Sequence, residues 1–71
     1  MSEKRVSSDI AQLKMLLAYW LEHNTEHAGE FEEWAEKISS SEKEVSELLE
    51  SAVVKMKEIN VCLEKAIKLL S

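Results

Sequence analysis

Two histidines and one glutamate are the residues whose types and spacing could do chemistry. His23 and His27 are four residues apart, and Glu30 follows three residues after His27. On a helix, residues three and four apart lie on the same face. Two imidazoles and a carboxylate on one helical face can chelate Zn, Ni, Co or Cu. His23, His27 and Glu30 are therefore the candidate metal ligands of this chain.

Structural roles compete with metal binding at these positions and are the favoured interpretation. A His pair at this spacing arises by chance on a helix rich in Glu, and His27 could be a buried, hydrogen-bonded imidazole. Residues 23–27 also match the H-x-x-E-H pattern of inverted zinc proteases. Those enzymes need a third ligand far downstream and a cleft, and 71 residues cannot supply them. We therefore expect no catalytic residues and no enzyme.

The elements that carry these residues follow from a heptad pattern. In the first half of the chain, apolar residues are spaced alternately four and three apart, with only Asn24 and His27 polar among them. This series is Val6, Ile10, Leu13, Leu17, Trp20, Asn24, His27, Phe31, Trp34 and Ile38. The spacing predicts one helix over about residues 8–38. Gly29 lies inside it and indicates either a kink or a close helix contact. A break near Asn24, giving three helices, is the alternative.

A second heptad series predicts a second helix over about residues 42–70. Its members are Val45, Leu49, Ala52, Met56, Ile59, Leu63, Ala66 and Leu70. Three serines at 39–41 form the turn between the two helices, and Ser41 with Glu44 matches a capping box that would begin the second helix. Folding about this turn brings Met56 near Asn24. The prediction is a single all-α domain, residues 1–71, built as an antiparallel helical hairpin.

A lone hairpin cannot cover so wide an apolar stripe, so we expect it to self-associate into a four-helix bundle. Asn24 would then fix the register of the assembly, and Cys62 would be a small buried hydrophobe, with a metal-ligating or disulfide-forming thiol as the alternative. Tyr19 is expected at the surface. The predicted interface residues are Leu17, Trp20, Leu21, Asn24, Phe31, Trp34, Leu49, Met56, Ile59 and Leu63.

Charge is divided between the two ends of the hairpin. Residues 22–50 hold ten Glu against Lys37 and Lys43, a balance of −8, whereas the rest of the chain has a balance of +3. Two hairpins side by side should therefore run in opposite directions, with the acidic turn of one beside the basic open end of the other. The expected partner is a second copy in an antiparallel homodimer.

Composition excludes several other classes of protein. One Cys rules out an intrachain disulfide, and one Gly with no Pro argues against turn-rich β folds. The net charge of −5 argues against nucleic-acid binding. The longest apolar run, residues 15–21, is too short to span a membrane. With no targeting signal and a lone free thiol, we expect a cytoplasmic protein.

The segment from Trp20 to Ala35 resembles a small helical-hairpin domain of uncharacterised archaeal and bacterial proteins. Its core is Glu22-His23-Asn24 followed by Glu26-His27-Ala28. The resemblance implies the hairpin fold and, at most, an association with metals. The sequence therefore predicts a non-enzymatic, oligomerising helical-bundle protein. The alternatives are a metal-binding module that uses the two histidines, and an adaptor that offers its apolar stripe to a larger partner.

Overall fold

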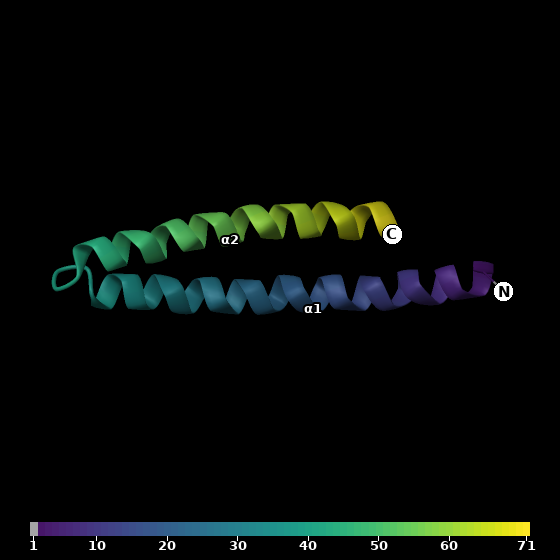
Figure 1. Ribbon diagram of the computed structural model, residues 1–71, viewed down its shortest axis with the longest axis horizontal. Coiled ribbons are helices and arrows are strands. Elements are labelled where there is room, and N and C mark those ends of the chain that lie inside the picture. The colour runs from purple at the N-terminus through teal and green to yellow at the C-terminus, as the bar shows by residue number, and fades with distance from the viewer. Residues whose placement is uncertain (1) are drawn as a thin grey trace.

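The chain folds as two long α-helices lying side by side (Figure 1). The computed structural model describes the backbone of residues 2–71 and the side chains of residues 8–71. Helix α1 spans Ser2–Lys37, and α2 spans Lys43–Leu70 and returns antiparallel to it. The molecule is a rod of 59 × 15 × 14 Å. The predicted all-α hairpin is confirmed, and α1 runs unbroken through Asn24 and Gly29.

The two helices differ in length more than the heptad pattern predicts. Helix α1 has 36 residues because it begins at Ser2 instead of near Ser8, whereas α2 has 28. The N-terminal part of α1 therefore extends past the end of α2 (Figure 1). Val6, the first predicted heptad position, lies outside the residues whose side chains are described. Over the described residues, neither helix combines the length and apolarity needed to cross a membrane.

The connection between the helices covers residues 38–42, and the predicted capping box is not formed. Glu42 is the N-cap of α2 and makes no side-chain capping hydrogen bond. The reason is that α2 begins one residue later than the pattern requires, so Ser41 lies in the turn, one residue before the N-cap. In the turn, Glu42 N–H donates to Ile38 O at 2.8 Å, and Ile38 N–H donates to Trp34 O at 3.1 Å.

Ser46 instead caps the preceding helix from across the hairpin. Its Oγ donates to Ala35 O at 2.7 Å, and the side chain is buried. The last carbonyls of an α-helix have no donor within the helix, so they need partners from elsewhere. The first turns of α2 are thus fastened directly to the end of α1.

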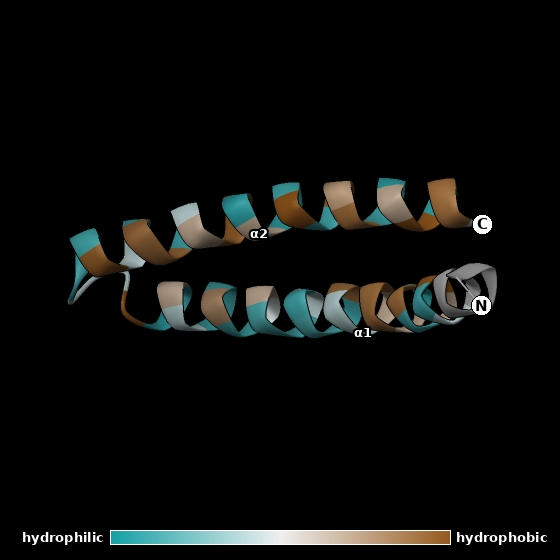
Figure 2. Cartoon of the chain, turned by 45° about the vertical axis from the view of Figure 1, so that its right-hand side comes forward, coloured by the Kyte–Doolittle hydropathy of each residue, from teal (hydrophilic) through white to brown (hydrophobic). Residues whose placement is uncertain are grey.

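The hairpin has a narrow core of small and medium side chains. The buried apolar residues of its described part are Leu17, Ala28, Ala35 and Val53. Alanines at a helix contact let the two backbones approach closely. Hydrophobic residues nevertheless recur along α2 and along the coloured part of α1, as the brown segments of Figure 2 show. Many large apolar side chains are exposed and therefore lie outside the core of the hairpin.

A polar contact sets the pairing of the helices further from the turn. Asn60 Nδ2 donates to Thr25 Oγ1 at 3.3 Å, and Thr25 Oγ1 in turn donates to Leu21 O at 2.8 Å. Asn60 thus lies opposite Thr25, whereas the predicted pairing of Asn24 was with Met56, one helical turn nearer the connection. The connection has five residues instead of the predicted three but is still centred on Ser40, so the shift arises in the packing of the helices and not in the turn.

Candidate functional site

A row of four aromatic rings runs along α1 and contains both histidines. The rings belong to Tyr19, His23, His27 and Phe31, each four residues from the next, so they lie along one side of the helix. Neighbouring ring centroids are 5.5, 4.4 and 6.2 Å apart along the row. Tyr19 is exposed, as predicted. The row places the two imidazoles next to each other.

The two histidines meet through their Nε2 atoms. His27 Nε2 and His23 Nε2 are 3.0 Å apart, at hydrogen-bond distance. Glu30 approaches the other side of the His27 ring, where its Oε2 lies 3.8 Å from Nδ1. That distance is too long for a hydrogen bond. We call His23 and His27 the His pair. Their two Nε2 atoms face each other, on the side of the His27 ring away from Glu30.

A complete metal site is not assembled within one chain. The described residues contain no group of three or more His, Cys, Asp or Glu side chains that could hold a metal ion. Within one chain the Nε2 atoms of His23 and His27 lie together, whereas the Glu30 carboxylate lies nearer to Nδ1 of His27. A metal site with His23, His27 and Glu30 as its ligands stays a prediction.

The second feature is an apolar face of the hairpin. Trp20 and Trp34 lie about a quarter of a turn to one side of the buried Ala28 on α1, and Ile59 lies to one side of the buried Val53 on α2. Because the helices are antiparallel, these two sides fall on the same face of the hairpin. We call it the apolar face; its exposed members are Leu13, Leu16, Trp20, Trp34, Val45 and Ile59.

The predicted interface residues divide between the core of the hairpin and this face. Leu17 is buried inside the hairpin, so it contacts α2 of its own chain and not the outer surface. Trp20, Trp34 and Ile59 are exposed, and Trp34 remains 56% exposed although Lys37 Nζ lies 4.6 Å from its ring centroid. The other predicted residues are half-buried: Leu21, Asn24, Phe31, Leu49, Met56 and Leu63.

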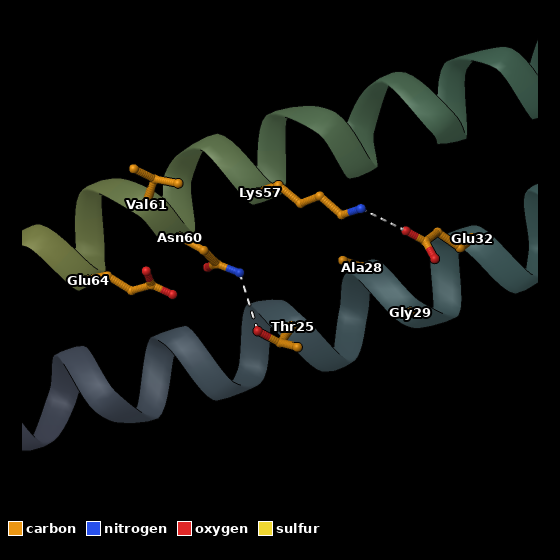
Figure 3. Close-up of a pocket in the computed structure, with 8 residues that line it drawn as sticks. All are labelled: Thr25, Ala28, Gly29, Glu32, Lys57, Asn60, Val61 and Glu64. Atoms are coloured by element: carbon orange, nitrogen blue, oxygen red, sulfur yellow. Dashed lines mark hydrogen bonds and ion pairs between the residues drawn. The ribbon is translucent and has the colours of Figure 1, made fainter.

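The opposite face of the hairpin carries a polar groove of about 490 Å³ (Figure 3). The Asn60–Thr25 hydrogen bond crosses it, and Lys57 Nζ lies 3.4 Å from Glu32 Oε1. Asn60 Oδ1 is buried there without a hydrogen-bond partner. The full lining is Thr25, Ala28, Gly29, Glu32, Lys57, Asn60, Val61 and Glu64. Polar contacts between the helices thus lie on this face, and large apolar side chains gather on the other.

Sequence reasoning missed two residues and misplaced a third. Ser46 and Asn60 lie seven residues before and after Val53, so all three lie on one face of the helix. The heptad series counts apolar residues and therefore leaves the two polar ones out. Cys62 was predicted to be buried and is exposed. Nine residues separate it from Val53, which amounts to two and a half helical turns, so it lies on the outside of α2.

Comparison with known proteins places the chain in a family. Residues 13–70 match the family described as "Domain of unknown function (DUF8180)". The chain belongs to this family. It is also 39% identical, over 59 residues, to an uncharacterized protein of Archaeoglobus fulgidus, and the match covers 83% of this chain and 95% of that relative. No solved structure matches the chain. The matched region of the DUF8180 family includes the His pair, the connection and the whole of α2.

Proposed function

We propose that this DUF8180 chain is a non-enzymatic assembly module in which two hairpins join through their apolar faces into an antiparallel four-helix bundle. The observation that carries the proposal is the apolar face. It presents two tryptophans, aliphatic side chains from both helices and half-buried Phe31 and Met56. Monomeric proteins rarely leave a contiguous apolar patch of this kind uncovered.

The accessible surface supports the same proposal. A compact monomer of 8.1 kDa is expected to expose about 4,500 Å². This chain exposes 5901 Å². The excess is larger than the roughly 800 Å² that each partner buries in a standard protein interface. Burial of about that area through one face would therefore remove more than half of the excess.

Charge favours a second copy as the occupant of this face and sets its direction. The half of the hairpin nearer the connection has a balance of −8, and the remainder of the chain has a balance of +3. Oppositely directed copies place each acidic half beside a basic half, whereas parallel copies would place the two acidic halves together. An unrelated partner would need the same complementary pattern along its whole length.

The antiparallel arrangement also defines a register. Counting outward from the Ser46–Ala35 contact places Leu70 level with Ala11, and counting from the Asn60–Thr25 contact places it level with Met15. Helix α2 therefore lies alongside α1 from about residues 11–15 to Lys37. Two such double-helical sections overlap fully when the two-fold axis crosses α1 between Asn24 and Glu26. Helix α1 then packs on α1 of the partner subunit.

Two substitutions of equal exposure test the proposal. Ile59 and Val61 are each 49% exposed, but Ile59 lies on the apolar face and Val61 lines the polar groove. Sedimentation equilibrium of the unaltered chain should give about 16 kDa, twice its mass of 8.1 kDa. Ile59→Glu should lower the measured mass to about 8 kDa, that of one chain, because the dimer would bury a carboxylate in its interface. Val61→Glu should remain dimeric.

The same measurement separates the competing functions. A folded monomer at every concentration would overturn the homodimer and leave an adaptor that offers its apolar face to a larger protein. Dissociation by Val61→Glu and not by Ile59→Glu would place the interface on the polar groove.

A further inference from the structure

We propose that the His pairs of two chains meet at the two-fold axis of the dimer and together bind one divalent transition-metal ion of the zinc class. This inference rests on the proposed antiparallel assembly. It adds a binding site that neither chain completes alone, with four imidazole Nε2 atoms as its ligands.

The two Nε2 atoms of the His pair are already spaced as in a bidentate chelate. Two imidazole nitrogens bound to one tetrahedral zinc, each about 2.0–2.1 Å from the metal, stand about 3.3 Å apart. The two Nε2 atoms in this chain are 3.0 Å apart. A small rotation of either ring would replace the shared hydrogen bond by a shared metal ion.

The His pair also lies at the level where the two chains should meet. The two-fold axis that gives full overlap of the double-helical sections crosses α1 at residues 24–26, between His23 and His27. His27 is seven residues from both Trp20 and Trp34, so it belongs to the same row of the apolar face. Packed helices are about 8–10 Å apart, a gap that side chains from both helices fill. His27 of each chain would therefore face the partner subunit's α1.

Glu30 fits this site as a supporting residue. Its carboxylate lies on the Nδ1 side of His27, at 3.8 Å, and leaves Nε2 free of it. Metal-bound histidines commonly donate the other ring N–H to a carboxylate, which fixes the tautomer that coordinates through Nε2. Glu30 thus becomes a positioning residue in place of the third ligand that the spacing first indicated.

Titration of the metal-free, untagged protein with ZnCl₂ tests the inference. Isothermal titration calorimetry should give one zinc per two chains, and Co²⁺ in its place should show the visible absorption of a tetrahedral site. His23→Ala and His27→Ala should each weaken zinc binding by about 100-fold or more, because each removes two of the four ligands of the shared site. Circular dichroism would check that both variants remain helical, as expected for side chains outside the hairpin core.

Two control variants separate ligands from neighbours. Glu30→Gln should keep one zinc per two chains and weaken binding by about 10-fold, the usual effect of losing an outer carboxylate. Cys62→Ser should bind zinc as the unaltered chain does, because Cys62 lies on the outside of α2.

Sedimentation of the same samples distinguishes the failure of this inference from that of the assembly. A metal-free dimer that binds no zinc, or one zinc per chain, would overturn the shared site and leave the assembly intact. A protein that stays monomeric with and without zinc would overturn both.

Discussion

At the scale of single residues, one serine closes the hairpin. Ser46 Oγ donates to Ala35 O at 2.7 Å in a buried position, whereas Ser41, the residue expected to cap α2, lies exposed in the turn. The S-x-x-E pattern from Ser41 to Glu44 is a sound local signal. It fails because α2 begins one residue later, with Glu42 as its N-cap, so Ser41 does not hold the capping position.

Exchanging each serine for alanine separates the two roles. Ser46→Ala should lower the free energy of unfolding by about 1–2 kcal/mol, because it leaves the Ala35 carbonyl buried without a donor. Ser41→Ala, the matched control, should change it by less than about 0.5 kcal/mol. Urea denaturation followed by circular dichroism measures both. A larger loss for Ser41→Ala would mean that the capping box forms after all.

Asn60 presents a different balance at the residue scale. Its Nδ2 reaches Thr25 at 3.3 Å, but its Oδ1 is buried without a partner. Such a residue pins the register of the two helices at a cost in stability.

Asn60→Leu should therefore raise the free energy of unfolding by about 1 kcal/mol, since an unpaired buried oxygen is removed. Lys57→Leu is the control on the same groove; Lys57 is largely exposed, so we expect little gain. Thermal unfolding of the two variants gives the comparison. A clear loss of stability in Asn60→Leu would show that its hydrogen bond to Thr25 outweighs the unpaired oxygen.

At the scale of the helices, the heptad pattern predicts the elements well and their packing less well. It gives two helices and their antiparallel order because burial of an apolar stripe has a period close to that of the helix. Residues of the predicted stripe such as Trp34 and Ile59 are nevertheless exposed, while the buried alanines Ala28 and Ala35 lie at its edge. The heptad stripe of each helix faces partly toward the other helix of the hairpin and partly toward the apolar face. This direction suits the centre of a four-helix bundle.

The His pair shows the same division between local and long-range information. The i,i+4 spacing predicts correctly that His23 and His27 approach each other, because a helix fixes that geometry. It does not reveal that Glu30 turns to the other ring nitrogen, which depends on side-chain rotamers. The cross-helix partners of Ser46 and Thr25 depend on how the two helices pack along their length, which the local sequence leaves undetermined.

Gly29 provides a prediction at the scale of the helix. It lies in the interior of α1, and a Cβ built on it meets nothing within 4 Å. A close helix contact, one of the two interpretations of Gly29, is therefore absent, and Gly29→Ala should raise the free energy of unfolding by about 1 kcal/mol through helix propensity alone. Thermal unfolding at a fixed protein concentration measures this. A loss of stability, or a weaker dimer, would show that a partner packs against Gly29 on the groove side.

At the scale of the whole molecule, the rod has too little core for its apolar content. Four apolar residues are buried among the described side chains, and two tryptophans are not among them. Small single-core chains are marginally stable unless a partner or a metal adds to the fold. Assembly through the apolar face supplies that missing burial, and the shared metal would reinforce it.

Trp34→Ala tests this claim because the two possible effects differ in size. In a lone hairpin the change removes a 56% exposed side chain and should cost less than about 1 kcal/mol. In the proposed dimer it should weaken association by about 2–4 kcal/mol, since a buried aromatic anchor is lost from each chain. Sedimentation equilibrium over a range of concentrations measures the dissociation constant. An unchanged constant would remove Trp34 from the interface.

The most direct test of the assembly is a distance between two copies of the turn. A spin label on Ser40→Cys, in a Cys62→Ser background, marks the exposed end of each hairpin. The two-fold axis at residues 24–26 places these labels about 45 Å apart, at about 1.5 Å per residue on each side of the axis. Double electron–electron resonance should therefore show one distance of about 45 Å. A distance below about 20 Å, as two turns packed at one end of a bundle would give, contradicts the antiparallel assembly. The absence of any dipolar coupling between chains contradicts the dimer itself.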